Sequence, residues 1–77
     1  TTIIPLEIPT ESFVKVAIYN ILGQEIIVLS EGIQQPGYEK IIWNATDQFG
    51  QQVSSGIYFI RVHYGKNIYH QKMMLLK

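Results

Sequence analysis

Short apolar segments alternate with clusters of Gly, Pro, Asn and Asp along the whole chain, at a spacing of about 8 to 12 residues. Such spacing is typical of antiparallel sandwiches and barrels, and no stretch has the periodicity of an amphipathic helix. We therefore predict an all-β fold, an Ig-like antiparallel β-sandwich of about seven short strands. A chain of 77 residues supports one core, so residues 1–77 are expected to form a single domain.

The individual strands are predicted from alternating apolar positions and from the turn residues between them. We expect strands over residues 2–8, 13–19, 25–29, 38–43, 57–62 and 67–76. Pro5 makes the first of these an edge strand, because proline cannot donate a ladder hydrogen bond. The stretches SEGIQQPG and NATDQFGQQVSSG are expected to break the sheet as loops, since small and polar residues dominate them.

A tight hairpin at residues 64–67 fixes the pairing of the last two strands. Gly65 can supply the positive φ that the first central position of a type II′ turn requires. Tyr64 then faces Asn67, and counting outward places Tyr58 opposite Met73 on the face that we expect to be buried.

The other face of this hairpin is unusually apolar for a sheet surface in water. The same register places Phe59 beside Lys72 and Ile57 beside Met74. The chain also ends in KMMLLK, where a polar tail is usual. We therefore predict an exposed apolar patch for a partner, edged by basic side chains; its members are Ile57, Phe59, Met74 and Leu76, and its edges are Arg61, His70 and Lys72.

Composition excludes several classes of function. Six basic and six acidic residues give a net charge of zero, and the basic residues are scattered, so no nucleic-acid partner is expected. No apolar run is long enough to cross a bilayer as a helix. Without cysteine, stability must come from apolar packing and hydrogen bonds. Thr1 is not a natural start, so we interpret the chain as a piece of a longer protein.

Catalytic and metal sites are not predicted. None of the four serines lies in a nucleophile elbow, and Asp47 is the only aspartate, so we expect no enzyme and no small-molecule substrate. His63 and His70 are interpreted as strand-surface residues rather than metal ligands. A calcium loop at Asn44, Asp47 and Gly50 would have a single carboxylate, which is too few. We expect no cofactor and no metal.

Two aromatic residues are interpreted as structural. Trp43 continues the apolar face of Ile41 and is expected in the core rather than in a sugar-stacking platform. Tyr58 follows Ser55 and Gly56 at a strand start, a placement like that of a tyrosine corner in Ig-like sandwiches. On the residues alone, Lys72 and Lys77 are equally well explained as solvated charges and as recognition residues.

Three stretches together resemble a known family. They are VKVAIYNILGQEI over residues 14–26, PGYEKIIWNATDQFGQQVSSGIYFIRV over residues 36–62, and the terminal KMMLLK. In this order and spacing they resemble the C-terminal sorting domains of type IX secretion in Bacteroidetes and their relatives. The Ig-like domain of the flagellar hook-capping protein is similar in pattern. Two departures are Asn44-Ala45, where the family often has Asp-Gly after its tryptophan, and Pro5 in the first strand.

The resemblance implies a non-catalytic secretion signal that is folded. Such a domain directs its cargo from the periplasm through an outer-membrane translocon, and a sortase-like surface protease commonly removes it at the cell surface. The segments that the resemblance ties to recognition are the Gly-x-Tyr element, here Gly56 and Tyr58, and the terminal strand with its lysines, here 72–77. We therefore expect these partner-binding residues: Gly56, Ile57, Tyr58, Phe59, Lys72, Met74, Leu76 and Lys77.

Other functions remain open at this point. A hook-cap-like scaffold domain would keep the fold, and a carbohydrate-binding or adhesive module would use exposed aromatic rings. A two-sided apolar strand at a chain end also predicts strand exchange between two copies, which would give a homodimer. Cargo, organism and cleavage position are not encoded in these residues.

Overall fold

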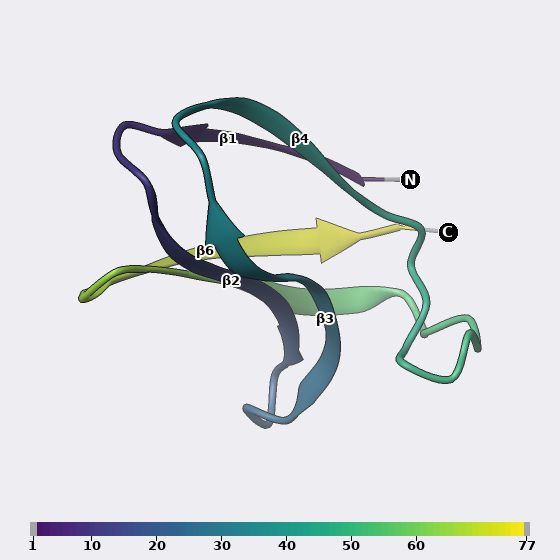
Figure 1. Ribbon diagram of the computed structural model, residues 1–77. Helices are drawn as coiled ribbons and strands as arrows, with labels where there is room; N and C mark the ends of the chain where they lie inside the picture. The colour runs from purple at the N-terminus through teal and green to yellow at the C-terminus, as the bar shows by residue number, and fades with distance from the viewer. Residues whose placement is uncertain (1, 77) are drawn as a thin grey trace.

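The computed structural model describes residues 2–76 as two packed antiparallel sheets (Figure 1). The strands are β1 (Thr2–Ile8), β2 (Ser12–Asn20), β3 (Glu25–Gln34), β4 (Gly37–Trp43), β5 (Gly56–Tyr64) and β6 (Asn67–Leu75). One sheet has the order β1-β4 and the other the order β3-β2-β5-β6. The predicted all-β, Ig-like sandwich is confirmed. The described residues contain no helix that could cross a membrane.

The number of strands and the length of β3 differ from the prediction. Six strands lie within residues 2–76, not about seven. We expected residues 30–37 to be a break, but β3 continues to Gln34 and pairs with the start of β2, with Ser12 opposite Gln34 and Val14 opposite Gly32. The backbone of β2 offers hydrogen-bonding groups along its whole length, and pairing with them overrides the weak strand propensity of SEG. The turn is confined to the residues around Pro36.

The predicted β5–β6 register is confirmed along the whole hairpin. Tyr64 pairs with Asn67, Tyr58 with Met73, and the series ends with Gly56 opposite Leu75. Gly65 has a φ of +56° and Lys66 does not have a positive φ, as a type II′ turn requires.

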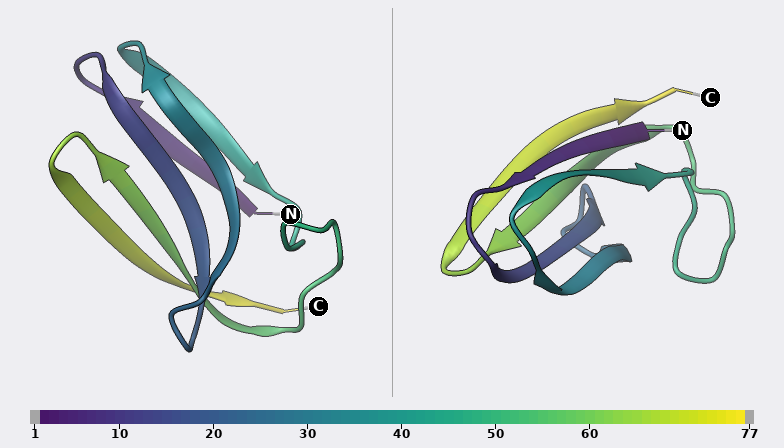
Figure 2. Two further views of the ribbon diagram at one scale, coloured as in Figure 1. Left: turned by 60° about the horizontal axis from the view of Figure 1, so that its bottom comes forward. Right: turned by 45° about the horizontal axis from the view of Figure 1, so that its top comes forward.

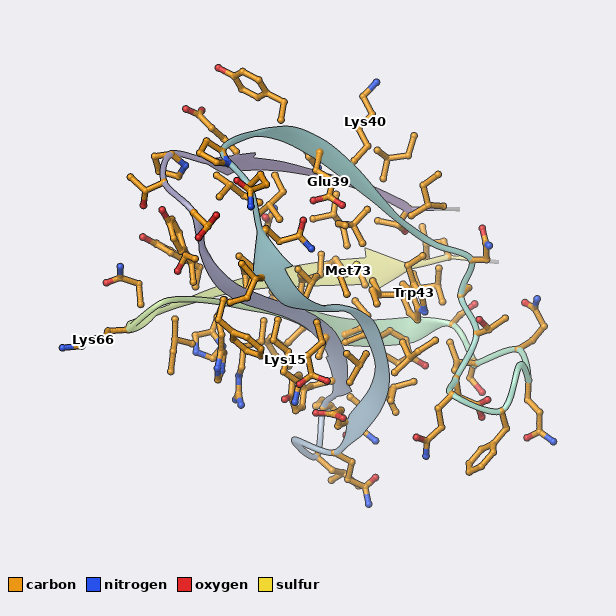
Figure 3. All side chains as sticks on the ribbon, viewed as in Figure 1. Lys15, Glu39, Lys40, Trp43, Lys66 and Met73 are labelled. Atoms are coloured by element: carbon orange, nitrogen blue, oxygen red, sulfur yellow. The ribbon has the colours of Figure 1, made fainter. Side chains whose placement is uncertain are left out.

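Trp43 lies in the core between the two sheets, at the end next to the loop that follows β4 (Figure 3). Only 1% of its surface is exposed, and its Nε1 donates a hydrogen bond to the Thr46 carbonyl at 2.8 Å. The prediction that this ring is a core residue is confirmed. It belongs to a buried cluster of side chains from β1, β2, β4 and β5, which consists of Ile4, Ile8, Val14, Val16, Ile18, Ile41, Trp43, Tyr58 and Ile60.

The two sheets do not cover each other equally. The two-stranded sheet lies across the four-stranded one; β1 and β6 are edge strands of their sheets, and the right view of Figure 2 shows β1 beside β6. Burial falls along the four-stranded sheet from β2 to β6: Val16 and Ile18 in β2 are fully buried, whereas most of β6 is exposed. The sandwich is therefore closed around β2 and open beside β6.

The loop that follows Trp43 contains a strained residue. Ala45 has a φ of +59°, and it is the one described residue other than glycine with a positive φ. Its carbonyl accepts a hydrogen bond from the Val53 N–H at 2.9 Å, which helps to hold this geometry. A left-handed conformation costs a residue with a Cβ about 1 to 2 kcal/mol. The position is the one where the resembled family often has glycine.

The substitution Ala45→Gly should therefore change stability much less than an ordinary buried Ala→Gly substitution, because the relieved strain of about 1 to 2 kcal/mol offsets the lost methyl group, about 0.8 kcal/mol, and the entropy that glycine adds to the unfolded chain, about 0.4 to 1 kcal/mol. Urea unfolding measures the change. Ala17→Gly is the matched control: Ala17 is also buried but lies in β2 without a positive φ, so its loss should destabilise. Equal destabilisation by both substitutions would contradict the assignment of strain to Ala45.

Candidate docking site

The predicted partner patch lies on the outer face of the β5–β6 hairpin. We call Ile57, Phe59, Met74 and Leu76 the terminal patch. Met74 and Leu76 are strongly exposed, at 66% and 80% of their surface. Ile57 and Phe59 are less exposed and count as half-buried. The register brings Ile57 opposite Met74 and Phe59 opposite Lys72, so three of the patch residues and one cation are neighbours across the two strands.

Tyr58 and Gly56 lie differently from the terminal patch. The Tyr58 side chain points into the core, where its ring meets Trp43 edge-on with centroids 5.4 Å apart. Its hydroxyl donates a hydrogen bond to the Ser54 carbonyl at 2.7 Å, so the placement expected from a tyrosine corner is confirmed. Tyr58 ties the preceding loop to the core and offers no surface to a partner. Gly56 begins β5 opposite Leu75.

Of the two lysines in the predicted site, only Lys72 belongs to the residues that the structure describes. Lys72 is exposed on the outer face, and nothing in its surroundings distinguishes recognition from simple solvation. Lys77 lies outside the described residues.

A stacked pair beside the terminal patch was not predicted from the sequence. The Arg61 guanidinium lies 4.3 Å from the centre of the Tyr19 ring. The Nε of Arg61 is buried and has no hydrogen-bond partner among the described residues. Next to this pair is a hollow of about 150 Å³, lined by Tyr19, Asn20, Ile21, Gly23, Phe59, Arg61 and His70. The outer face thus combines aromatic and apolar surface with a positive charge.

No local signal identifies this pair, because it depends on β5 pairing with β2, its partner on the side away from the hairpin. That pairing sets Tyr19 opposite Phe59 and Ala17 opposite Arg61. The sequence does contain one sign of the surrounding apolar surface, although not of the pair itself. Ile21 and Leu22 are large apolar residues in a tight turn, and both are strongly exposed.

An ion pair braces the same face. Lys15 Nζ lies 3.2 Å from a Glu25 carboxylate oxygen, and the Tyr19 hydroxyl donates to that oxygen at 3.1 Å. The hydrogen bond from Lys15 lowers the pKa of Glu25, and the same contact raises the pKa of Lys15. Both groups are solvent-exposed, so the pair contributes little energy and mainly orients Tyr19 beneath Arg61.

The histidines and the aspartate do not form a chemical centre. His63 pairs with Ile68 and His70 with Arg61, so the two imidazoles are not opposed. Asp47 accepts hydrogen bonds from the N–H groups of Phe49 and Gln51, at 2.9 and 3.0 Å, which shapes the loop. Within residues 2–76 no three His, Asp or Glu side chains are grouped to hold a metal ion. The predictions that the protein is not an enzyme and binds neither cofactor nor metal remain predictions.

Comparison with known protein families decides the family. The family description "FlgD Ig-like domain" matches residues 6–67, which is most of the chain. This chain belongs to the FlgD Ig-like domain family. No curated protein and no solved structure matches it.

The FlgD Ig-like match covers the chain from the middle of β1 to the hairpin turn, and it ends at Asn67, the first residue of β6. Membership of this family therefore rests on β1 to β5 and on the loop after Trp43. The match says nothing of β6 beyond its first residue.

The Glu25 ion pair predicts a specific pH dependence in this FlgD Ig-like domain. Because folding lowers the pKa of Glu25, its contribution to stability is present above the ordinary range of a glutamate and is lost as the pH falls through the lowered value. Glu25→Gln should be slightly less stable than the unmodified domain at pH 7, and the difference should vanish near pH ~2. Thermal unfolding from pH 2 to 7 measures this, with Glu7→Gln on the other sheet as control. A difference that stayed constant with pH would contradict the ion pair's role.

Proposed function

We propose that this FlgD Ig-like domain is a non-catalytic docking module, and more specifically a C-terminal sorting domain of type IX secretion. In this role it directs an exported cargo from the periplasm through the outer-membrane translocon. A sortase-like surface protease then removes it at the cell surface. The terminal patch makes the contact with the translocon, and Lys72 adds charge specificity.

The observation that carries this proposal is the last strand. Met73 and Leu75 pack against the core, while Met74 and Leu76 between and after them are exposed. Met73 and Leu75 anchor this segment to the core, so that Met74 and Leu76 can present an apolar contact surface to a partner. Exposed apolar residues of this kind, beside half-buried Phe59 and Ile57, mark partner surfaces.

A second candidate, favoured by the family match, is a hook-cap-like scaffold domain. It requires the same fold and would use the same outer face in an assembly rather than as an export signal. A carbohydrate-binding module is less well supported, because the exposed aromatic rings are dispersed: Tyr38 lies on the two-stranded sheet, Phe49 on the β4–β5 loop, and Phe13 and Tyr69 on opposite faces of the four-stranded sheet. Stacking on sugars requires rings on one face.

The double substitution Met74→Glu and Leu76→Glu tests the sorting role. Both side chains are exposed, so the domain should stay folded, while desolvating two carboxylates on docking should reduce surface-delivered cargo on the order of tenfold. Cargo fused to the domain is quantified on the cell surface and in the periplasm of a type IX-competent host.

Ile42→Glu is the matched control, since Ile42 is an exposed apolar residue on the other sheet and should leave export unchanged. Thermal unfolding verifies that every variant is folded. Undiminished surface delivery by the double variant would refute docking through the terminal patch. A loss of hook assembly in a flagellated host, with normal export, would instead favour the scaffold role.

A further inference from the structure

The outer edge of β6 is free for a further strand. β6 is the last strand of its sheet and pairs with β5 on one side only. In a two-residue hairpin the residues flanking the turn form a hydrogen-bonded pair, and such pairs alternate with pairs that are not hydrogen-bonded. Counting from Tyr64 and Asn67, the backbone N–H and C=O groups that point away from β5 belong to Ile68, His70, Lys72 and Met74. They form a template for strand addition.

The three other outermost strands each have a feature that discourages such pairing. β1 contains Pro5, and β3 is interrupted by two shifts in its register to β2. In β4, Glu39 is half-buried and points toward the space between the sheets, whereas Lys40 points away (Figure 3). β6 has no proline, no register shift and no inward charge. Among the described edges, the one at β6 is therefore the most open to a partner strand.

The charge on the hairpin indicates the chemistry of that partner. All six acidic residues of the chain precede β5, whereas the segment from Gly56 onward contains Arg61, Lys66, Lys72 and Lys77 and no Asp or Glu. The chain's zero net charge thus conceals a cationic hairpin. His70 and Lys72 are on the outer face of β6, and Arg61 lies opposite His70. Charges of one sign along an interface favour a partner of the opposite sign.

A second copy of the chain fits this edge poorly. Antiparallel pairing of two full β6 strands would place the two-fold axis at Gln71, the middle residue of Asn67–Leu75. Lys72 of each copy would then face His70 of the other, with both Arg61 side chains nearby. The two Lys72 ammonium groups and the two Arg61 guanidinium groups would gather around that axis, and β6 contains no acidic residue to offset them, so the strand exchange or dimerisation predicted from the sequence is the weaker alternative.

The inner side of β6 indicates which side chains a partner strand should carry on the face that it turns toward the core. Hollows of about 230, 130 and 270 Å³ follow one another between β1 and β6, and their linings are largely apolar. Tyr69 and Met73 point to this side, yet Tyr69 is 57% exposed because the two-stranded sheet does not reach over it. A strand added to β6 would lay every second side chain over these two residues, and β-branched side chains suit that position.

We propose that the free edge of β6 binds an extended acidic segment of another protein by antiparallel strand addition. The segment has apolar residues opposite Ile68 and Met74 and acidic residues opposite His70 and Lys72. The residues between these four point to the inner side of the sheet and are apolar or β-branched. This inference deepens the proposed function, on which it rests for its biological setting, by naming the kind of segment that docks at the end of the domain.

The probe is a capped synthetic peptide, Ile-Thr-Glu-Val-Glu-Thr-Ile, titrated into the isotope-labelled 77-residue chain and followed by nuclear magnetic resonance. Binding should protect the amides of Ile68, His70, Lys72 and Met74 from hydrogen exchange, and higher salt should weaken it. Two control peptides have the same length: one with both Glu replaced by Lys, and one with both Glu amides methylated. Each should bind at least about tenfold more weakly, through charge repulsion or the loss of backbone donors.

The reciprocal variant is Lys72→Glu, which should reverse the preference between the acidic and the basic peptide, whereas Lys40→Glu on β4 should not. Equal binding of the acidic and basic peptides, protection located away from β6, or dimerisation of the chain in sedimentation experiments without peptide would each overturn the proposal. The peptide experiment does not involve export. Failure of strand addition with normal dependence of export on Met74 and Leu76 would reject this inference alone.

Discussion

The packing of Trp43 between the two sheets is the contact on which the domain depends. Its indole is the largest fully buried side chain of a small core to which four of the six strands contribute. Fully burying large apolar side chains contributes about 2 to 3 kcal/mol each, and a chain without disulfides has few other sources of stability. The Trp43 Nε1 also anchors the loop that follows through the Thr46 carbonyl. Core and loop are thus stabilised by one residue, and Tyr58 repeats this arrangement from β5 through Ser54.

The position of β6 at the edge of its sheet explains why it differs from the other strands. The two-stranded sheet packs over β2 and β5 and leaves the inner side of β6 partly uncovered. Only Met73 and Leu75 reach the core, near the end of the strand. β6 is consequently held by its backbone ladder to β5 and by these two contacts, so its edge and most of its side chains face solvent. A domain built this way keeps its core independent of what binds at its last strand.

Sequence reasoning succeeded where the determining interactions are local. The alternation in β2 and β4 identified their buried faces, and Gly65 fixed the whole β5–β6 register through one tight turn. Reasoning was wrong where the determining contact is distant in sequence. The residues SEG in β3 have little strand propensity and are ordered by pairing with β2. The Arg61 and Tyr19 stack similarly requires that β5 pair with β2, which brings together residues 42 positions apart in the sequence, and no local pattern indicates this.

The distribution of charge carries information that the net value hides. Zero net charge and scattered basic residues led us to expect no nucleic-acid partner, yet the acidic residues end at Asp47 and every later charged side chain is positive. In the folded domain this division becomes spatial, because β5 and β6 are neighbours and their outer faces share Arg61, His70 and Lys72. In the strand addition that we propose, this cationic edge strand repels its own copies and attracts an acidic strand, so one set of side chains would both oppose self-association and select a partner. The apolar residues at both ends of the edge, Ile68 and Met74, would then limit that proposed partner to one with matching apolar ends.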